Sequence, residues 1–405
     1  MKIKANMKGE KQMAITKLTN TQIQTLVNSA YKQMTGKEAM TAEDLSAFSD
    51  SGTSDVTALR EAFTGKLLAT VAKNWYTDSS YRSSYRDVFF EDASRFGAIT
   101  QAISVTVPEV KENSAWRSFQ SGTTTVGQYT VYLPVVDTKY YVKSESWALP
   151  ITITGEQWDT AFRSETDLYD FVGYIFMCVD NALVQHMEDL NNANRNHFIA
   201  EKINASNNSV AGIHVVDLVS AYVADAGIST DFSVAQFLNS ENALRYAIEQ
   251  IGLYIGYMKK QTALFNTEGK VRFVPEERLV VQLLGFFTKR LDTVARSQTF
   301  HNDLVALPLY DEVPAWQSMN SLTFDNLSKI NIKLSSTVTV EQSGIVGLIC
   351  DKWAIVHTQK SQRVATQRFD IEDLTLYEYQ YRDQYMNNLT MNAVVFLLKD
   401  HTAAA

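Results

Sequence analysis

Residues 164–203 read SETDLYDFVGYIFMCVDNALVQHMEDLNNANRNHFIAEKI, and this stretch predicts one unbroken helix. Ser164 suits the N-cap, and Glu165 and Asp167 suit the first turn because acids are favoured at the positive end of the helix dipole. Apolar side chains and one histidine then recur at the three- and four-residue spacing of a helix face: Leu168, Phe171, Val172, Ile175, Val179, Ala182, Leu183, His186, Leu190 and Ala193. At 1.5 Å per residue this helix would be about 57 Å long. That length is typical of a coiled coil, a repeat element or the spine of a large flat domain.

The chain before this helix is polar first and strand-like later. Helices are expected at Thr19–Met34 and Asp55–Trp75, and Ala98–Val110 has strand character. Strand-like runs at Gln128–Val136 and Lys139–Trp147 predict a hairpin that turns near Asp137. A two-stranded hairpin buries little by itself, so it needs a partner surface.

The chain after the helix alternates helices and strands. A turn-rich break is expected at 204–212, followed by a helix at Ser240–Lys260 that Ser240 caps. Shorter elements are expected as strands at Lys270–Val274 and Arg278–Leu283, a helix at Gly285–Thr293 and an alternating run at Ile330–Val340, and Asp303–Leu307 leads into the segment Pro308–Trp316. The chain ends in strands at Gly344–Asp351, Trp353–Thr358, Leu374–Tyr385 and Asn392–Lys399, some of them continuously apolar and therefore buried. The fold class is α+β.

Composition limits the classes of function. The chain has 405 residues, enough for two or three domains, and its 45% hydrophobic content is typical of a globular protein. A net charge of −8 argues against a dedicated nucleic-acid binder. Cys178 and Cys350 lie in apolar runs and are expected to be buried free thiols. No window approaches 18 uncharged apolar residues, so no membrane span is expected.

Catalytic motifs are absent from the sequence. It contains no phosphate-binding loop, nucleophile elbow, zinc-protease helix or Cys-x-x-Cys pair. His186 and His197 are eleven residues apart on the long helix, too far to share a metal. Three acidic groups could chelate a hard cation but are expected to be solvated turns or charges for contacts between subunits: Glu276–Glu277, Asp311–Glu312, and Asp370 with Glu372 and Asp373. We therefore expect no enzyme activity, no cofactor and no metal.

The order of elements resembles the major capsid proteins of tailed bacteriophages with the Hong Kong 97 type fold. The resemblance is carried by residues 123–152 as an extended loop, by 164–203 as a spine helix, and by 343–399 as the return of the chain in long strands. In size, the chain is similar to capsid proteins of small podophages of Gram-positive bacteria.

The resemblance implies a division of the chain and a role. It implies an N-terminal arm with helices at 1–110, an extended β-hairpin loop at 111–153, a peripheral domain at 154–204 and 345–405, and an axial domain at 205–344. The role would be a subunit that self-assembles as pentamers and hexamers into the virion capsid, an icosahedral head around double-stranded DNA. The arm is too short and too little charged to serve as a scaffold, so a separate scaffolding protein and a portal are implied as partners. DNA would be held only by weak, non-specific contact because the chain is acidic.

Contacts between subunits are expected from the arm and the loop, since neither can bury its own apolar face. The residues expected to make them are Arg82, Arg86, Tyr129, Tyr132, Lys139, Tyr141, Lys143, Glu145 and Trp147. Stacking of single-stranded nucleic acid on the arm's Ser-Tyr-Arg repeat is an alternative that the acidic chain disfavours. The helix is expected to lay its apolar face on the chain's own strands and to turn the polar segment Asn191–Asn196 toward one wall of the shell.

Three other functions stay open at this point. An encapsulin-like compartment shell would share the fold but enclose cargo enzymes. An enzyme could assemble its site from scattered residues. A coiled-coil adaptor could use the long helix, although the rest of the chain is rich in strands.

Overall fold

A computed structural model describes residues 90–91, 100–105, 136–141, 145–154, 165–296, 310–369 and 374–403. The chain divides into two compact units. Unit 1 comprises residues 1–87, 144–190 and 359–384, and unit 2 comprises 88–143, 191–358 and 385–405.

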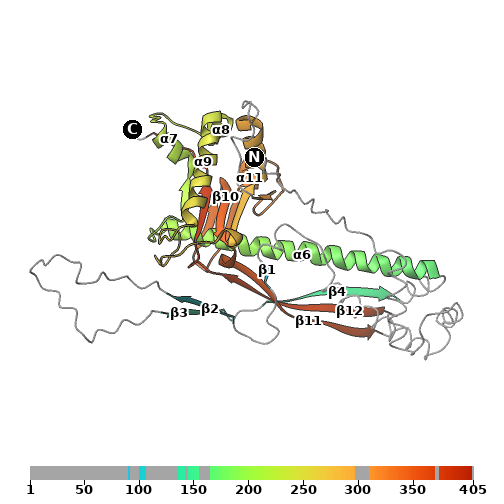
Figure 1. Cartoon of the computed structure of the whole chain (residues 1–405). Helices are drawn as coiled ribbons and strands as arrows, with labels where there is room; N and C mark the ends of the chain where they lie inside the picture. The colour runs from blue at the N-terminus through green and yellow to red at the C-terminus, as the bar shows by residue number, and fades with distance from the viewer. Residues whose placement is uncertain are drawn as a thin grey trace, which may run out of the picture. The chain divides into compact units, whose positions relative to one another are not determined.

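The long helix is confirmed. Helix α6 spans Glu165–Asn207 without a break (Figure 1), slightly beyond the predicted end at Ile203. Val179 and Leu183 are buried as the spacing predicts, but Ala193 is exposed. The predicted cap Ser164 and the side chains of Leu168, Phe171, Val172 and Ile175 lie outside the described part of the structure.

The polar segment of α6 contradicts its predicted position. Asn191, Arg195 and Asn196 are 5%, 1% and 2% exposed, so this segment does not face a shell wall. Asn196 Nδ2 donates to the Trp316 carbonyl at 2.5 Å, and the Arg195 guanidinium lies 4.8 Å from the Trp316 ring centroid. These polar side chains are buried because a distant part of the chain supplies their partners.

The strands near the predicted hairpin pair differently from the prediction. β3 (Val136–Tyr141) pairs antiparallel with β2 (Thr100–Val105), so Asp137 lies opposite Ser104 inside a strand and the predicted turn there is wrong. β4 (Glu145–Thr154) pairs instead with β12 (Leu374–Asn387). An alternating strand fixes which side chains share a face, but it does not fix its partner strand.

One sheet contains β12 in the strand order β1-β11-β12-β4, with β1 at Phe90–Glu91 and β11 at Ile355–Phe369. β12 alternates as predicted, and its buried face carries Thr375, Tyr377, Tyr379 and Tyr381. The strand expected at Trp353–Thr358 begins only at Ile355, because Asp351 caps a short 3-10 turn, Lys352–Ala354.

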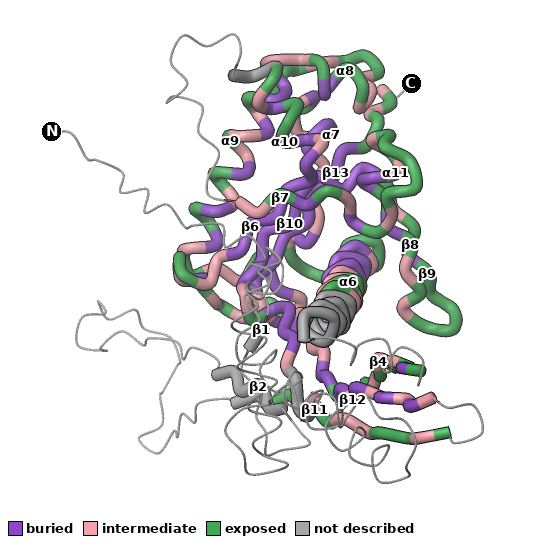
Figure 2. Tube along the Cα trace, turned by 90° about the vertical axis from the view of Figure 1, so that its right-hand side faces the viewer, coloured by how far each residue is buried: buried purple, intermediate pink, exposed green. Residues whose placement is uncertain are grey.

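A five-stranded sheet forms the core of unit 2, in the order β5-β13-β10-β6-β7. Its strands are β5 (Val215–Asp217), β6 (Leu279–Leu284), β7 (Asp311–Val313), β10 (Ile345–Asp351) and β13 (Ala393–Leu397). β10 and β13 are buried along their whole length (Figure 2), which confirms the prediction from their continuous apolar runs.

Short helices pack around this sheet. They are α7 (Leu218–Asp225), α8 (Val234–Asn239), α9 (Glu241–Met258), α10 (Gly285–Arg290), the π-helical turn η3 (Leu291–Arg296), the 3-10 turn η2 (Glu276–Arg278) and α11 (Phe324–Leu327). Ser240 caps α9 as predicted by accepting a bond from the Ala243 amide. The alternating run at 330–340 becomes the hairpin of β8 (Ile330–Lys333) and β9 (Thr339–Gln342).

Some predictions are corrected or fall outside the described residues. The strand expected at Lys270–Val274 is a loop with one isolated bridge, Arg272 to Thr262. Cys350 is a buried free thiol, whereas the side chain of Cys178 is not described. The helices expected at 19–34 and 55–75 also lie outside the described residues.

The described part of the chain holds neither a membrane-spanning helix nor a metal-binding cluster. None of the helices there is both long and apolar enough to cross a membrane. No cluster of three or more His, Cys, Asp or Glu side chains there could hold a metal ion.

Candidate functional site

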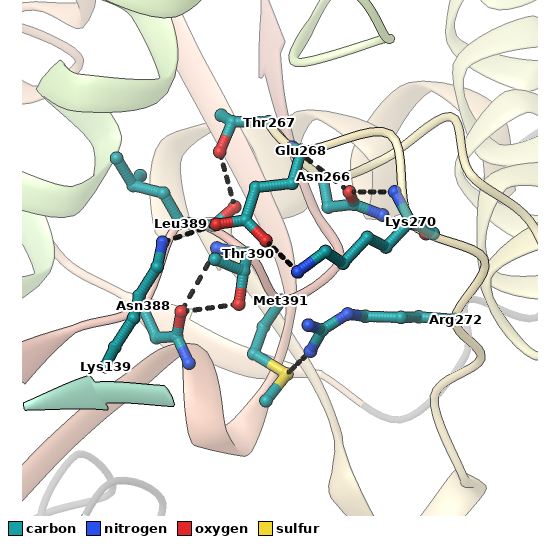
Figure 3. A network of polar contacts seen from close by, with 10 residues as sticks. All are labelled: Lys139, Asn266, Thr267, Glu268, Lys270, Arg272, Asn388, Leu389, Thr390 and Met391. Atoms are coloured by element: carbon teal, nitrogen blue, oxygen red, sulfur yellow. Dashed lines mark hydrogen bonds and ion pairs between the residues drawn. The ribbon is translucent and has the colours of Figure 1, made fainter. Parts of the chain in front are cut away.

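An ion-pair cluster ties the base of the β2–β3 pair to the loop at residues 262–275 (Figure 3). Glu268 Oε1 lies 2.6 Å from Lys139 Nζ on β3, and Glu268 Oε2 lies 2.9 Å from Lys270 Nζ. The Glu268 side chain is 26% exposed and that of Lys270 is 17% exposed. One half-buried carboxylate therefore bridges two ammonium groups, one of them on a strand that comes from far back in the chain.

The loop that carries Glu268 is folded around Asn266, which is completely buried. Asn266 Oδ1 accepts from the amides of Glu268 and Lys270 at 3.3 and 3.0 Å, and its Nδ2 donates to the Lys270 carbonyl at 2.7 Å. This arrangement is an Asn-centred turn, which the sequence Asn-Thr-Glu-Gly-Lys favours. These bonds hold the backbone at Glu268 independently of Lys139.

The same loop is bonded to the chain that leads into β13. The Thr267 amide and hydroxyl both donate to the Leu389 carbonyl, at 3.3 and 3.2 Å. Asn266 Nδ2 donates to Asn392 Oδ1 at 3.2 Å, and Arg272 Nη1 lies 3.3 Å from Met391 Sδ. The base of β2–β3 is thus held on the core sheet of unit 2 through the loop.

The electrostatics of the cluster favour the charged carboxylate. Burial alone would raise the pKa of Glu268, but hydrogen bonds from Lys139 and Lys270 outweigh burial and hold the pKa below its usual value. Next to it, burial and the charges of Glu201 and Glu268 raise the pKa of Tyr141. Tyr141 therefore stays a neutral phenol, whereas Glu268 stays an anion at neutral pH.

A buried lysine of α6 holds the other end of the loop. Lys202 Nζ donates to the Phe265 carbonyl at 3.2 Å, and burial lowers the pKa of Lys202 to about 7. Lys202 is completely buried, so its hydrogen bond fixes the loop to the helix at a cost in desolvation.

A second group of predicted residues lies at the start of β4, in unit 1. Trp147 Nε1 donates to Asp383 Oδ2 at 2.5 Å, and its ring stacks on Tyr381 at 4.2 Å between centroids. The His186 ring of α6 meets Trp147 edge-on at 4.5 Å, as expected for a helix laid on the chain's own strands. Glu145, the first residue of β4, is exposed.

The structure therefore brings together only part of the predicted contact set. Lys139 and Tyr141 lie in the cluster at the base of β2–β3, and Glu145 and Trp147 lie together on β4. The described residues exclude Arg82, Arg86, Tyr129, Tyr132 and Lys143. Sequence reasoning missed Glu268, Lys270 and Asn266, although the Asn–Gly turn signal at 266–269 could have pointed to a loop there.

The comparisons with known proteins give a family. The family model described as "Phi29-like phage major capsid protein" matches residues 22–397. A comparison with curated proteins found no match.

Solved phage structures share a distant likeness. A chain of the capsid structure of Staphylococcus phage Andhra is 10% identical, with a TM-score of 0.46, and the match covers 76% of this chain and 82% of that one. A chain from the native bacteriophage P68 structure of the head fibre and inner core protein is 10% identical, with a TM-score of 0.45 and 78% and 84% coverage. A chain of the bacteriophage PhiM1 mature capsid is 8% identical, with a TM-score of 0.42 and 78% and 87% coverage. At these values the assignment rests on the family model.

Proposed function

Because the chain belongs to the Phi29-like phage major capsid protein family, we propose that its copies close into pentamers and hexamers as they build the head. As a major capsid protein, it is a structural subunit of the icosahedral head of a tailed phage, and its place is the virion capsid. It is a self-assembling structural protein rather than an enzyme. The family match over residues 22–397 is the observation that carries this conclusion, and it favours a phage head over an encapsulin-like shell.

The proposed partners are a separate scaffolding protein, a portal and packaged double-stranded DNA. The net charge of −8 supports a weak, non-specific contact with DNA, because an acidic inner surface does not hold a polyanion that must later leave. Heterologous contacts that close by rotation give the rings.

We propose that the chain is divided into an N-terminal arm, an extended loop, a peripheral domain with the spine helix and an axial domain. The pairing of β2 with β3 supports an extended loop whose base lies at Thr100–Val105 and Val136–Tyr141. The short helices of unit 2 and its strands β5, β6 and β7 support an axial domain at 205–344. β10 and β13, which the proposed division puts in the peripheral domain, belong to the same sheet.

The proposed contacts with neighbouring subunits are Arg82, Arg86, Tyr129, Tyr132, Lys139, Tyr141, Lys143, Glu145 and Trp147. The exposure of Glu145 supports its role. Lys139 and Trp147 already have partners in their own subunit, Glu268 and Asp383, so their contribution would be to hold the loop and β4 in the geometry that a neighbour meets.

Shortening the extended loop tests this function. Replacing residues 108–133 by a short Gly-Ser linker keeps β2, β3 and the Lys139–Glu268 ion pair, so the chain should fold with an unchanged thermal unfolding midpoint. We expect the variant to form no closed shells when it is co-expressed with its scaffolding protein, as judged by electron microscopy. Normal shells from this variant would show that the extended-loop assignment is wrong.

A further inference from the structure

We infer that a ridge on α9 of one subunit docks into a groove between α10 and α11 of the next subunit, and that this contact closes the capsomer ring. The ridge is Glu249, Leu253 and Tyr257, with Gly252 and Gly256 beside them. The groove is lined by Gly285, Phe286, Lys289, Arg290, Thr293, Glu312, Pro314, Leu322 and Leu327. The inference rests on the proposed assembly into rings and names the surfaces that form them.

The ridge is an apolar surface that its own subunit leaves uncovered. Leu253 is 39% exposed and Tyr257 is 54% exposed, whereas Leu244, Ile251 and Ile255 of the same helix are buried. A Cβ atom built on Gly252 or Gly256 meets no atom within 4 Å, so a neighbour can approach the helix backbone there. Exposed apolar side chains grouped on one helix are typical of an interaction surface.

The groove has apolar and charged walls, since Phe286, Pro314, Leu322 and Leu327 line it together with Lys289, Arg290 and Glu312. Its volume is about 460 Å³, compared with about 30 Å³ for one water in the liquid, so it can take whole side chains. The Phe286 ring lies 5.5 Å from that of Phe324, and Leu322, which lines the groove, is 73% exposed. Groove and ridge therefore both expose apolar side chains on one unit.

The ridge and the groove are two different patches of unit 2, although α9 packs against η3, whose Thr293 lines the groove. Figures 1 and 2, which are turned by 90° from each other, both place α9 and α11 on opposite sides of β10. Two different patches that are both exposed on one subunit can pair head to tail with a second copy. Repeated by rotation, such a contact gives a closed ring.

Charge complementarity indicates that the segment which enters the groove is α9 of a second copy. Lys289 Nζ already lies 3.2 Å from Glu312 Oε2, which raises the pKa of Lys289. Arg290, at 5.7 Å over the Phe286 ring, is exposed beside this pair, so the side chains that line the groove include two bases and one acid. Asp292 of η3 acts on Lys289 as a further negative charge. Glu249 is exposed one turn before Leu253 on the ridge, so a second copy of α9 brings an acid to Arg290 as its apolar side chains enter the groove.

The test is a charge swap. Glu249→Arg and Arg290→Glu should each lower the yield of closed shells, made with the scaffolding protein, at least tenfold, because like charges then meet at the contact. The double variant should restore the yield to within a few-fold of wild type. Lys333→Glu, an exposed charge reversal on β8, is the matched control and should assemble normally.

Two outcomes would overturn the inference: single variants that assemble like wild type, or single defects that the double variant does not rescue. Circular dichroism and thermal unfolding establish that each variant folds. If wild-type chains make no shells, the proposed function itself is wrong. If wild-type chains assemble and the charge reversals do not change the yield of closed shells, only this contact is wrong.

A cross-link gives a second readout that needs no loss of assembly. Leu253→Cys combined with Leu322→Cys should, on mild oxidation of shells, give disulfide-linked ladders of up to five or six chains on a denaturing gel without reductant. Each variant that carries only one of these two substitutions, beside the native Cys178 and Cys350, should stay monomeric. Shells of the double-cysteine variant that yield only monomers would contradict the contact.

Discussion

At the scale of residues, a few buried polar groups hold the parts of unit 2 together. Glu268 joins β3 to the loop at 262–275, and Asn196 joins α6 to Trp316. The sequence identifies these residues as polar but does not show that they are buried or which groups they bind. Their partners are far away along the chain, 120 positions for Asn196 and Trp316, so no local pattern could have named them.

Glu268→Gln removes the charge that Lys139 and Lys270 share. We expect a loss of about 1 kcal/mol in the free energy of unfolding at pH 7, since partly exposed ion pairs contribute little. The folded pKa of Glu268 is lowered, so its stabilisation is present above the unfolded pKa and is lost as pH falls through the folded pKa. Urea unfolding of both proteins between pH 7 and pH 3 measures this difference. A difference that stays constant down to pH 3 would contradict the ion-pair role.

Asn196→Ala leaves the Trp316 carbonyl without its shortest partner in a dry site. We expect a loss of about 1–3 kcal/mol, the cost of an unsatisfied buried polar group. Asn207→Ala, at the exposed end of the same helix, is the control and should change the free energy of unfolding by less than about 0.5 kcal/mol. Equal effects of the two substitutions in urea unfolding would show that Asn196 is not a structural anchor.

At the scale of elements, the periodicity of apolar residues predicted the type of an element and its buried face, but not which element it packs against. Long or strongly patterned segments, such as α6, α9, β10, β12 and β13, were predictable because their side-chain pattern shows directly which face is buried. The turn near Asp137 was wrong for the converse reason: 128–147 reads as a hairpin locally, but β3 and β4 find better partners in β2 and β12. Partner choice depends on contacts distant in sequence, which alternation does not encode.

Gly344 controls how β10 enters the core sheet. Its φ is +80°, and a Cβ built there would lie 2.1 Å from the Leu398 carbonyl oxygen beside β13. Gly344→Ala should therefore destabilise the protein by about 3 kcal/mol or more, from backbone strain and the clash together. Gly269→Ala, with φ +64° and open space around it, should cost only about 1 kcal/mol. If thermal unfolding gives the same loss for both, the close approach of Gly344 to β13 is wrong.

At the scale of the whole molecule, the sequence predicted the role of the protein and some residues of the candidate site, but not the residue that organises the site. The element order pointed to a capsid subunit, and the family match over residues 22–397 agrees with it. Of the expected contact residues, Lys139 and Tyr141 meet in one cluster, but Glu268, which organises that cluster, was not predicted. The sequence shows which segments lack enough apolar surface to fold alone. It does not show which residues contact those segments, because these residues come together only in the folded core.

The central claim is that this chain is the building block of a closed head. Electron microscopy of particles purified after co-expression with the scaffolding protein tests it most directly. The account predicts uniform closed shells whose class averages resolve rings of five and six subunits. Soluble monomers alone, under conditions in which both proteins are folded, would contradict it.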